Sequence, residues 1–262
     1  MQLFDSHCHL DDKAFDRDRD AVIQRARQND VHEWMTIGVD RETSLQALQI
    51  ARRYSGGYAA IGVHPHDAAS CSESTLQYLK HLSKDPKIRA WGETGLDFNR
   101  MYSPRTDQEK WFVRQIQAAD ALNLPLVFHE RDSNGRFLDI LLAHSPNGRQ
   151  GVVHCFSGSE SELNAYLDMG LCIGITGILT LKDRGAGLRK LIPYVPSDRL
   201  LVETDAPYLT PTPQKNKTRR NEPAFVKSVL LKLAEVRKED PEVLAHMTRE
   251  NARRLFKIFS GS

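Results

Sequence analysis

The sequence has little cysteine, a small net charge and no long apolar segment, and each absence narrows the possible classes of protein. Four cysteines at irregular spacing match neither a disulfide scaffold nor a structural zinc motif, so we expect buried, reduced thiols. No apolar run approaches the roughly 20 residues that span a bilayer, and the first ten residues do not resemble a signal peptide. These features predict a cytoplasmic protein with no membrane partner and no obligate protein partner.

The charge balance excludes a broad electrostatic surface for a polyanion. The formal net charge is only +2, although 27% of the residues are charged. Any binding to nucleic acid would therefore depend on a local basic patch. A length of 262 residues with 40% hydrophobic content supports a sizeable core, and we expect residues 1–262 to form a single domain.

Eight short apolar segments rich in strand-forming residues alternate with amphipathic segments. The expected strands are Leu3–His9, Glu33–Val39, Tyr58–His64, Arg89–Gly95, Leu124–His129, Gly151–Phe156, Leu171–Thr176 and Leu200–Asp205. The expected helices are Asp18–Asn29, Thr43–Tyr54, Ser72–Lys84, Thr106–Leu122, Gly135–Ala143, Glu160–Met169, Ala186–Ile192, Glu222–Arg237 and Pro241–Phe259. This alternation is typical of parallel βαβ units in an α/β protein.

Eight such units in this length predict a closed (β/α)8 barrel, the TIM barrel. An open, doubly wound sheet is the alternative. We disfavour it because neither G-x-G-x-x-G nor G-x-x-x-x-G-K-[ST], the glycine-rich motifs of nucleotide-binding sheets, occurs in the sequence.

Polar residues gather where the expected strands end, which is where such barrels carry their chemistry. Four of the eight strand ends carry histidine, although the chain has only ten histidines. The first strand ends in His7 and His9, which share a face because they lie two residues apart. The converging residues are His7, His9, Glu93, His129, His154 and Asp205. This set of nitrogen and oxygen ligands fits two divalent ions with open positions, such as zinc, manganese or magnesium.

Seven motifs carry a resemblance to a known family. They are Phe4–Asp11 (FDSHCHLD), Gly62–His66 (GVHPH), Gly92–Asp97 (GETGLD), His129–Asp132 (HERD), His154–Gly158 (HCFSG), Glu203–Tyr208 (ETDAPY) and Arg219–Pro223 (RRNEP). In this order and over nearly the whole chain, they resemble the TatD family of metal-dependent deoxyribonucleases in the amidohydrolase superfamily.

The resemblance implies a role for each ligand. His7, His9 and Asp205 would hold one ion with Glu93, and Glu93 would bridge to a second ion that the strand-end residues His129 and His154 hold. Glu93 and Asp205 would be the catalytic residues. Asp205 would orient a metal-bound water and accept its proton, and the hydroxide so formed would attack phosphorus.

The long irregular segment Pro211–Arg220 contains four basic residues above the expected site. We expect Arg219 and Arg220 to contact phosphate. Asn221 is expected to cap the helix that follows, Glu222–Arg237. His64 is not needed as a ligand and could donate to a phosphate oxygen, whereas we interpret His66 as a structural histidine.

The resemblance implies a 3′–5′ exodeoxyribonuclease that acts on single strands. A pocket at a barrel mouth also suits a strand end better than the middle of a duplex. One alternative is hydrolysis of a C–N or ester bond in a small molecule, as elsewhere in the superfamily. Another is a non-catalytic nucleic-acid-binding barrel. The residues themselves do not distinguish DNA from RNA.

Overall fold

The computed structural model describes residues 1–145 and 148–259, in which eight parallel strands form one sheet in sequence order. The strands are β1 (Leu3–Cys8), β2 (Val31–Ile37), β3 (Gly57–Ile61), β4 (Ile88–Asp97), β5 (Leu126–Arg131), β6 (Gly151–Val153), β7 (Cys172–Ile175) and β8 (Leu200–Val202). A parallel bridge between Cys8 and Ala206 joins the first strand to the segment after the last. The predicted TIM barrel is confirmed.

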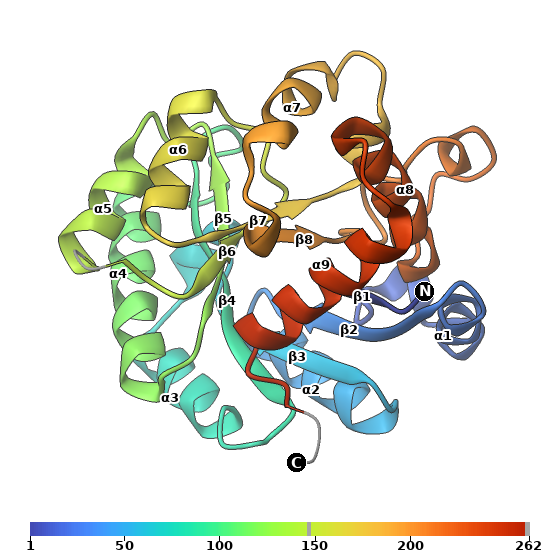
Figure 1. The fold of residues 1–262 in the computed structure, drawn as a ribbon. Coiled ribbons are helices and arrows are strands. Elements are labelled where there is room, and N and C mark those ends of the chain that lie inside the picture. The colour runs from blue at the N-terminus through green and yellow to red at the C-terminus, as the bar shows by residue number, and fades with distance from the viewer. Residues whose placement is uncertain (146–147, 260–262) are drawn as a thin grey trace.

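The helices alternate with the strands and surround them (Figure 1). They are α1 (Arg19–Gln28), α2 (Arg41–Arg53), α3 (Glu73–Leu82), α4 (Arg105–Leu122), α5 (Arg136–His144), α6 (Glu160–Asp168), α7 (Ala186–Leu191), α8 (Val226–Arg237) and α9 (Pro241–Leu255). Local sequence starts several of them: Asp40 and Ser159 each form a capping box at the first turns of α2 and α6. No helix of the described residues is long and apolar enough to cross a membrane.

One apolar cluster fills the end of the barrel interior that lies away from the carboxyl ends of the strands. Each strand contributes at least one buried side chain to it, from Phe4 on β1 to Leu201 on β8. The end of α9 and the residues after it close this end with Leu255, Phe256 and Ile258, and the rings of Phe4 and Phe256 lie 6.0 Å apart. The carboxyl ends of the strands therefore form the mouth of the barrel.

Strand β1 has an irregular register that brings its histidines into the mouth. Phe4 faces the barrel interior, so strict alternation would send His7 to the opposite face. The pairing of β1 with β2 shifts between Asp5 and Cys8, and this irregularity restores the inward direction. Cys8 instead packs in an outer cluster with Trp34.

One predicted helix start is wrong. Helix α8 begins at Val226 after a 3-10 turn at Pro223–Phe225, and Asn221 does not cap it. The Asn221 amide donates to the carbonyls of Thr204 and Tyr208, at 2.8 and 2.6 Å. Asn221 therefore fastens the chain that leaves β8 to the loop that follows it.

Candidate metal centre

The first strand of the barrel and the segment that follows the last strand meet at the site. The backbone N–H of Asp205 donates to the carbonyl of His7 at 2.8 Å, and that of His9 donates to Ala206 at 2.7 Å. The buried Asp5 carboxylate accepts the Thr204 N–H and hydroxyl at 2.8 and 2.6 Å. Residues nearly 200 positions apart are therefore fixed against each other where the barrel closes.

Glu93 lies between two sets of histidines. Its Oε2 is 3.4 Å from His7 Nε2, whereas its Oε1 is 2.8 Å from His129 Nδ1. Glycine at position 92 permits this placement, because Gly92 has φ +146° and a Cβ there would lie 2.3 Å from the Val127 carbonyl oxygen. The carboxylate thus presents one oxygen to each side of the mouth.

Asp205 and His154 complete the side of the site that contains His7 and His9. Asp205 Oδ1 lies 3.4 Å from His9 Nε2 and 3.6 Å from His154 Nε2. The rings of His7 and His154 stack with centroids 3.4 Å apart. The side-chain positions group His154 with His7 and Asp205, whereas the sequence predicts that His154 shares an ion with His129.

The other side of the site contains residues that were not predicted as metal ligands. His64 Nε2 is 3.2 Å from His129 Nδ1 and 3.6 Å from Glu93 Oε1. Asp97 Oδ2 lies 3.2 Å from His129 Nε2 and 2.7 Å from His66 Nε2. Asp97 ends the Gly92–Asp97 motif, so a signal for it was present. His66, interpreted from the sequence as a structural histidine, lies in this cluster beside Asp97.

Partners behind the rings set the direction of two imidazoles. His9 Nδ1 donates to the Ile37 carbonyl at 3.0 Å, so its Nε2 is directed toward Asp205, 3.4 Å away. His154 Nδ1 lies 2.7 Å from Oε1 of Glu203, a fully buried carboxylate. Such partners fix the orientation of a metal-binding histidine and raise its basicity.

The electrostatics of the site favour positive charge at its centre. Burial opposes ionisation of Glu93, yet His64, His7 and His129 hold the pKa of its carboxyl well below the usual range. Burial likewise disfavours charged His9, but the neighbouring Asp205 raises the pKa of that imidazole to about 10. Ionised carboxylates in this buried setting therefore require neighbouring cations.

The donor set fits divalent ions. Among the described residues, three groups have ligand atoms within 4.8 Å of one another: His7, His9 and Glu93; His7, His154 and Asp205; and His64, His66 and His129. His7 Nε2 and His9 Nε2 lie only 3.2 Å apart, so two ring nitrogens point at one place. Imidazole and carboxylate ligands of this kind suit zinc, manganese and similar ions.

The predicted substrate contacts lie in different surroundings. Arg219 is exposed. The guanidinium of Arg220 pairs with Asp18 at 2.7 Å and donates to the Ala14 carbonyl at 2.7 Å. His64 is buried, and its Nδ1 accepts the backbone N–H of His66 at 3.0 Å. Contact of these three residues with phosphate remains a prediction.

Comparison with known proteins identifies the family. The family model described as TatD related DNase matches residues 4–257. The chain belongs to the TatD family. A relative from Salmonella typhimurium, named 3′-5′ ssDNA/RNA exonuclease TatD, is 42% identical over 259 residues, which cover 98% of this chain and 99% of that protein.

Solved TatD structures have the same fold. The TatD homologue YjjV from Escherichia coli K12 superposes with a TM-score of 0.90 at 30% identity and covers 98% of both chains. A TatD family hydrolase from Entamoeba histolytica, at 24% identity, shows the fold alone, with a TM-score of 0.86 over 97% of this chain and 98% of that chain. The predicted family and the predicted enzyme class, a hydrolase of phosphodiester bonds, are confirmed.

Proposed function

We propose that the chain is a two-metal exonuclease that removes nucleotides from the 3′ end of single-stranded DNA. One observation carries the proposal: the two oxygens of Glu93 face separate sets of imidazole nitrogens, as expected of a carboxylate that bridges two ions. The Salmonella relative, which is similar over almost its whole length, is named for activity on single-stranded DNA and RNA. The four cysteines are free thiols, which supports a reducing cytoplasm as the location.

The ligands divide between two ions. We assign His7, His9 and Asp205 to one ion and His129 and His154 to the other, with Glu93 shared. Bound at these residues, divalent ions would lower the pKa of water and neutralise charge on the phosphoryl oxygens. His154 lies beside His7 and Asp205 and not in a group with His129, so the division needs a direct test. Replacing both His7 and His9 by alanine should leave one ion bound per chain, whereas loss of both ions together would contradict the assignment.

Asp205 is suited to act as the general base. Burial opposes its ionisation, but His154 and His9 keep the pKa of its carboxyl below the ordinary value, so it is ionised near neutral pH. Its side chain is 14% exposed and therefore reaches the mouth. An ionised carboxylate at this position can orient the attacking water and accept its proton.

Two exposed tyrosines border the site on different sides. Tyr102 is 66% exposed and lies edge-on to His66, with ring centroids 4.7 Å apart. Tyr208 is 53% exposed, and its centroid lies 5.9 Å from that of His9. Aromatic rings in such positions stack on unpaired bases, which a duplex does not offer. The arrangement favours a single strand over a small-molecule substrate.

The test uses a single-stranded oligodeoxynucleotide labelled at its 5′ end and protein reconstituted with zinc, manganese or magnesium. Shortening from the 3′ end produces a ladder of labelled products. Asp205→Asn should abolish the ladder, and Asp168→Asn, a matched change at an exposed position, should not. Equal products from wild type and Asp205→Asn would contradict the role of Asp205. No products with two ions bound would favour a small-molecule substrate.

A further inference from the structure

A hollow lies between the start of α6 and helix α7. Its volume is about 450 Å³, within the range of roughly 300–1,000 Å³ for small-molecule sites. One wall is the turn Ser157–Glu160, which follows β6, and the other is built by residues 184–194, which follow β7. Both walls follow strands whose carboxyl ends lie at the mouth. This α6–α7 groove therefore starts at the same end of the barrel as the metal centre.

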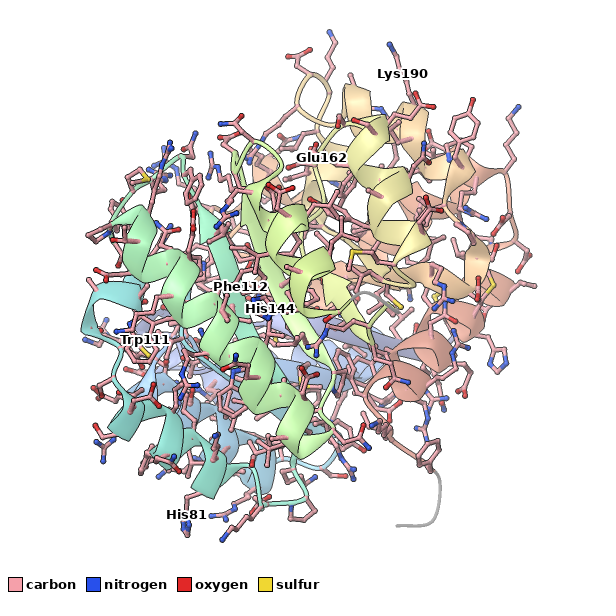
Figure 2. The ribbon with its side chains drawn as sticks, turned by 90° about the vertical axis from the view of Figure 1, so that its left-hand side faces the viewer. His81, Trp111, Phe112, His144, Glu162 and Lys190 are labelled. Atoms are coloured by element: carbon pink, nitrogen blue, oxygen red, sulfur yellow. The ribbon has the colours of Figure 1, made fainter. Side chains whose placement is uncertain are left out.

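The α6–α7 groove carries two cations without partners. Arg184 and Lys190 line it and are exposed, and neither forms an ion pair with any described residue. Glu160 is the one carboxylate among the lining residues. Figure 2 shows Lys190 at the edge of the molecule opposite His81 of α3. The cations are therefore available to an anionic ligand.

The wall that carries these cations is held in place by the protein itself. The guanidinium of Arg189 donates to the carbonyls of Leu179 and Leu181, at 2.9 and 2.7 Å. These bonds tie α7 to the loop that leaves β7. Arg189 is thus used structurally, whereas its neighbours Arg184 and Lys190 are not.

An exposed aromatic ring completes the α6–α7 groove. Tyr194 is 70% exposed, and Leu188 and Leu191 line the groove with it. A basic groove with an aromatic platform is the usual means of binding a single strand without sequence preference, because phosphates meet cations and bases stack on the ring.

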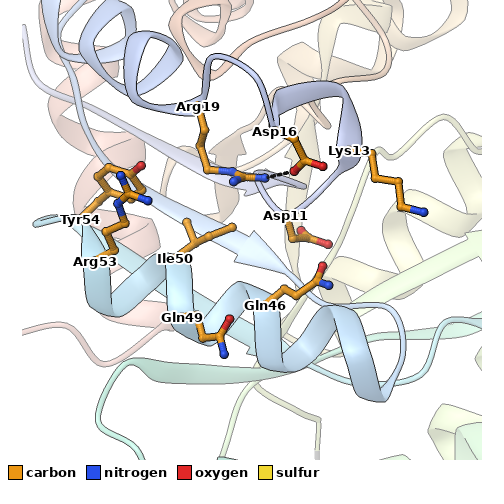
Figure 3. Close-up of a pocket in the computed structure, with 9 residues that line it drawn as sticks. All are labelled: Asp11, Lys13, Asp16, Arg19, Gln46, Gln49, Ile50, Arg53 and Tyr54. Atoms are coloured by element: carbon orange, nitrogen blue, oxygen red, sulfur yellow. Dashed lines mark hydrogen bonds and ion pairs between the residues drawn. The ribbon is translucent and has the colours of Figure 1, made fainter.

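Another hollow has different chemistry. It lies between the loop after β1 and helix α2, and its lining includes Asp11, Asp16 and Arg19 (Figure 3). Arg19 is already paired with Asp16 at 2.7 Å. Asp11 is 9% exposed, and its Oδ1 has no partner among the described residues. Lys13 and Arg53 also line this hollow, and Arg53 is paired with Asp20 at 2.9 Å. Because two of its three cations are already paired with carboxylates, the α6–α7 groove is the better path for a strand.

We propose that the α6–α7 groove binds the part of a single strand that lies behind the nucleotide being removed. Arg184 and Lys190 contact phosphates, and Tyr194 stacks on a base. This inference rests on the proposed function, since the metal centre holds the strand end from which the groove leads away. The groove therefore favours long strands over dinucleotides.

Binding and cleavage are measured separately to test this. Affinity for a fluorescent 12-nucleotide single-stranded DNA is measured by anisotropy at several salt concentrations, with every variant in an Asp205→Asn background that does not cleave. Log affinity falls as log salt rises, and each lost phosphate contact makes this slope less steep by about 0.7 for single strands. Arg184→Ala with Lys190→Ala should therefore reduce its magnitude by about 1.4. Lys80→Ala with Lys84→Ala removes the same charge near His81 and should leave the slope unchanged.

Tyr194 is tested by a pair of substitutions. Tyr194→Ala should weaken binding at least fivefold with an unchanged salt slope, and Tyr194→Phe, which keeps the ring, should bind like the parent protein. An unchanged slope in the Arg184 and Lys190 double variant would overturn the inference. So would equal binding by Tyr194→Ala and Tyr194→Phe.

Cleavage of a dinucleotide by protein with intact Asp205 reports the proposed function independently. The Arg184 and Lys190 double variant should cleave the dinucleotide at the wild-type rate and show a KM for the 12-nucleotide strand raised about tenfold. If the wild type cleaves neither substrate, the proposed function fails, whatever the binding data show. If the double variant loses cleavage of both substrates equally, the α6–α7 groove is not a path for the strand.

Discussion

The Glu203 carboxylate lies 2.7 Å from Nδ1 of His154 and accepts the backbone N–H of the next residue, Cys155, at 2.6 Å. Its other oxygen accepts the hydroxyl of Ser6 at 3.2 Å. Glu203 is fully buried and therefore out of reach of substrate. It acts through His154, whose opposite ring nitrogen faces Asp205.

Replacing Glu203 by glutamine should weaken the metal centre without unfolding the barrel. The amide keeps the shape of the side chain but removes the negative charge beside His154 Nδ1. Loss of such a partner lowers metal affinity by about 10–100-fold. A metal titration of DNA cleavage measures this, and excess metal should restore the rate. Glu73→Gln, at an exposed ion pair, should behave like wild type. Equal metal affinity in Glu203→Gln and wild type would contradict the positioning role.

Gly174 leaves the space that Glu203 occupies. A Cβ at position 174 would lie 2.5 Å from Glu203 Oε2, so alanine must displace the buried carboxylate. We expect Gly174→Ala to lower the free energy of unfolding by about 1–3 kcal/mol and to reduce metal affinity as Glu203→Gln does. Urea unfolding and the metal titration measure the two effects. Gly187→Ala meets nothing within 4 Å and should not destabilise the protein. If Gly174→Ala is equally well tolerated, Glu203 is not held as described.

The sequence predicts the barrel and the gathering of His7, Glu93, His129 and Asp205 for a general reason. The carboxyl ends of barrel strands converge, so a polar residue at a strand end can be placed in the mouth without any coordinates. The family motifs lead to the same residues. Periodicity alone also placed the helices to within a few residues, because their apolar faces repeat regularly.

The sequence does not predict which residues far apart along the chain form contacts. Asp97 was not expected beside His129, because the predicted strand ended at Gly95, whereas β4 runs to Asp97. Contact of Arg220 with phosphate stays a prediction. Its ion pair with Asp18 was not predicted, because it joins residues 202 positions apart. The cap expected at Asn221 failed for the same reason, because carbonyls of the β8 exit compete for its amide.

Replacing Arg219 or Arg220 by alanine should have different effects. Arg219 is exposed and available to substrate, so Arg219→Ala should lower the salt slope of DNA binding by about 0.7 and leave stability unchanged. Arg220 bonds to Asp18 and Ala14, so Arg220→Ala should lower the free energy of unfolding by about 1–3 kcal/mol. Anisotropy and urea unfolding test both variants. The reverse pattern would contradict these assignments.

Ionisation of Asp18 makes the free energy of unfolding depend on pH in the acid range. Hydrogen bonds from Arg220, with help from Arg25, hold the pKa of Asp18 at about 2. A carboxyl with a lowered pKa contributes stability above its unfolded value near 3.9, and that contribution disappears as pH falls through about 2. Asp18→Asn should therefore be less stable than wild type at pH 6, by about 0.5–1 kcal/mol for such a partly exposed pair. The difference should shrink toward pH 2. A difference that is constant with pH would show that the ion pairs contribute nothing.

The central claim is that Glu93 joins two ions in one catalytic centre. The most direct measurement adds manganese in known equivalents to metal-free protein and follows shortening of 5′-labelled single-stranded DNA. The rate should rise with added metal and level off at two equivalents per chain. A plateau at one equivalent, or cleavage that does not depend on metal, would contradict the account.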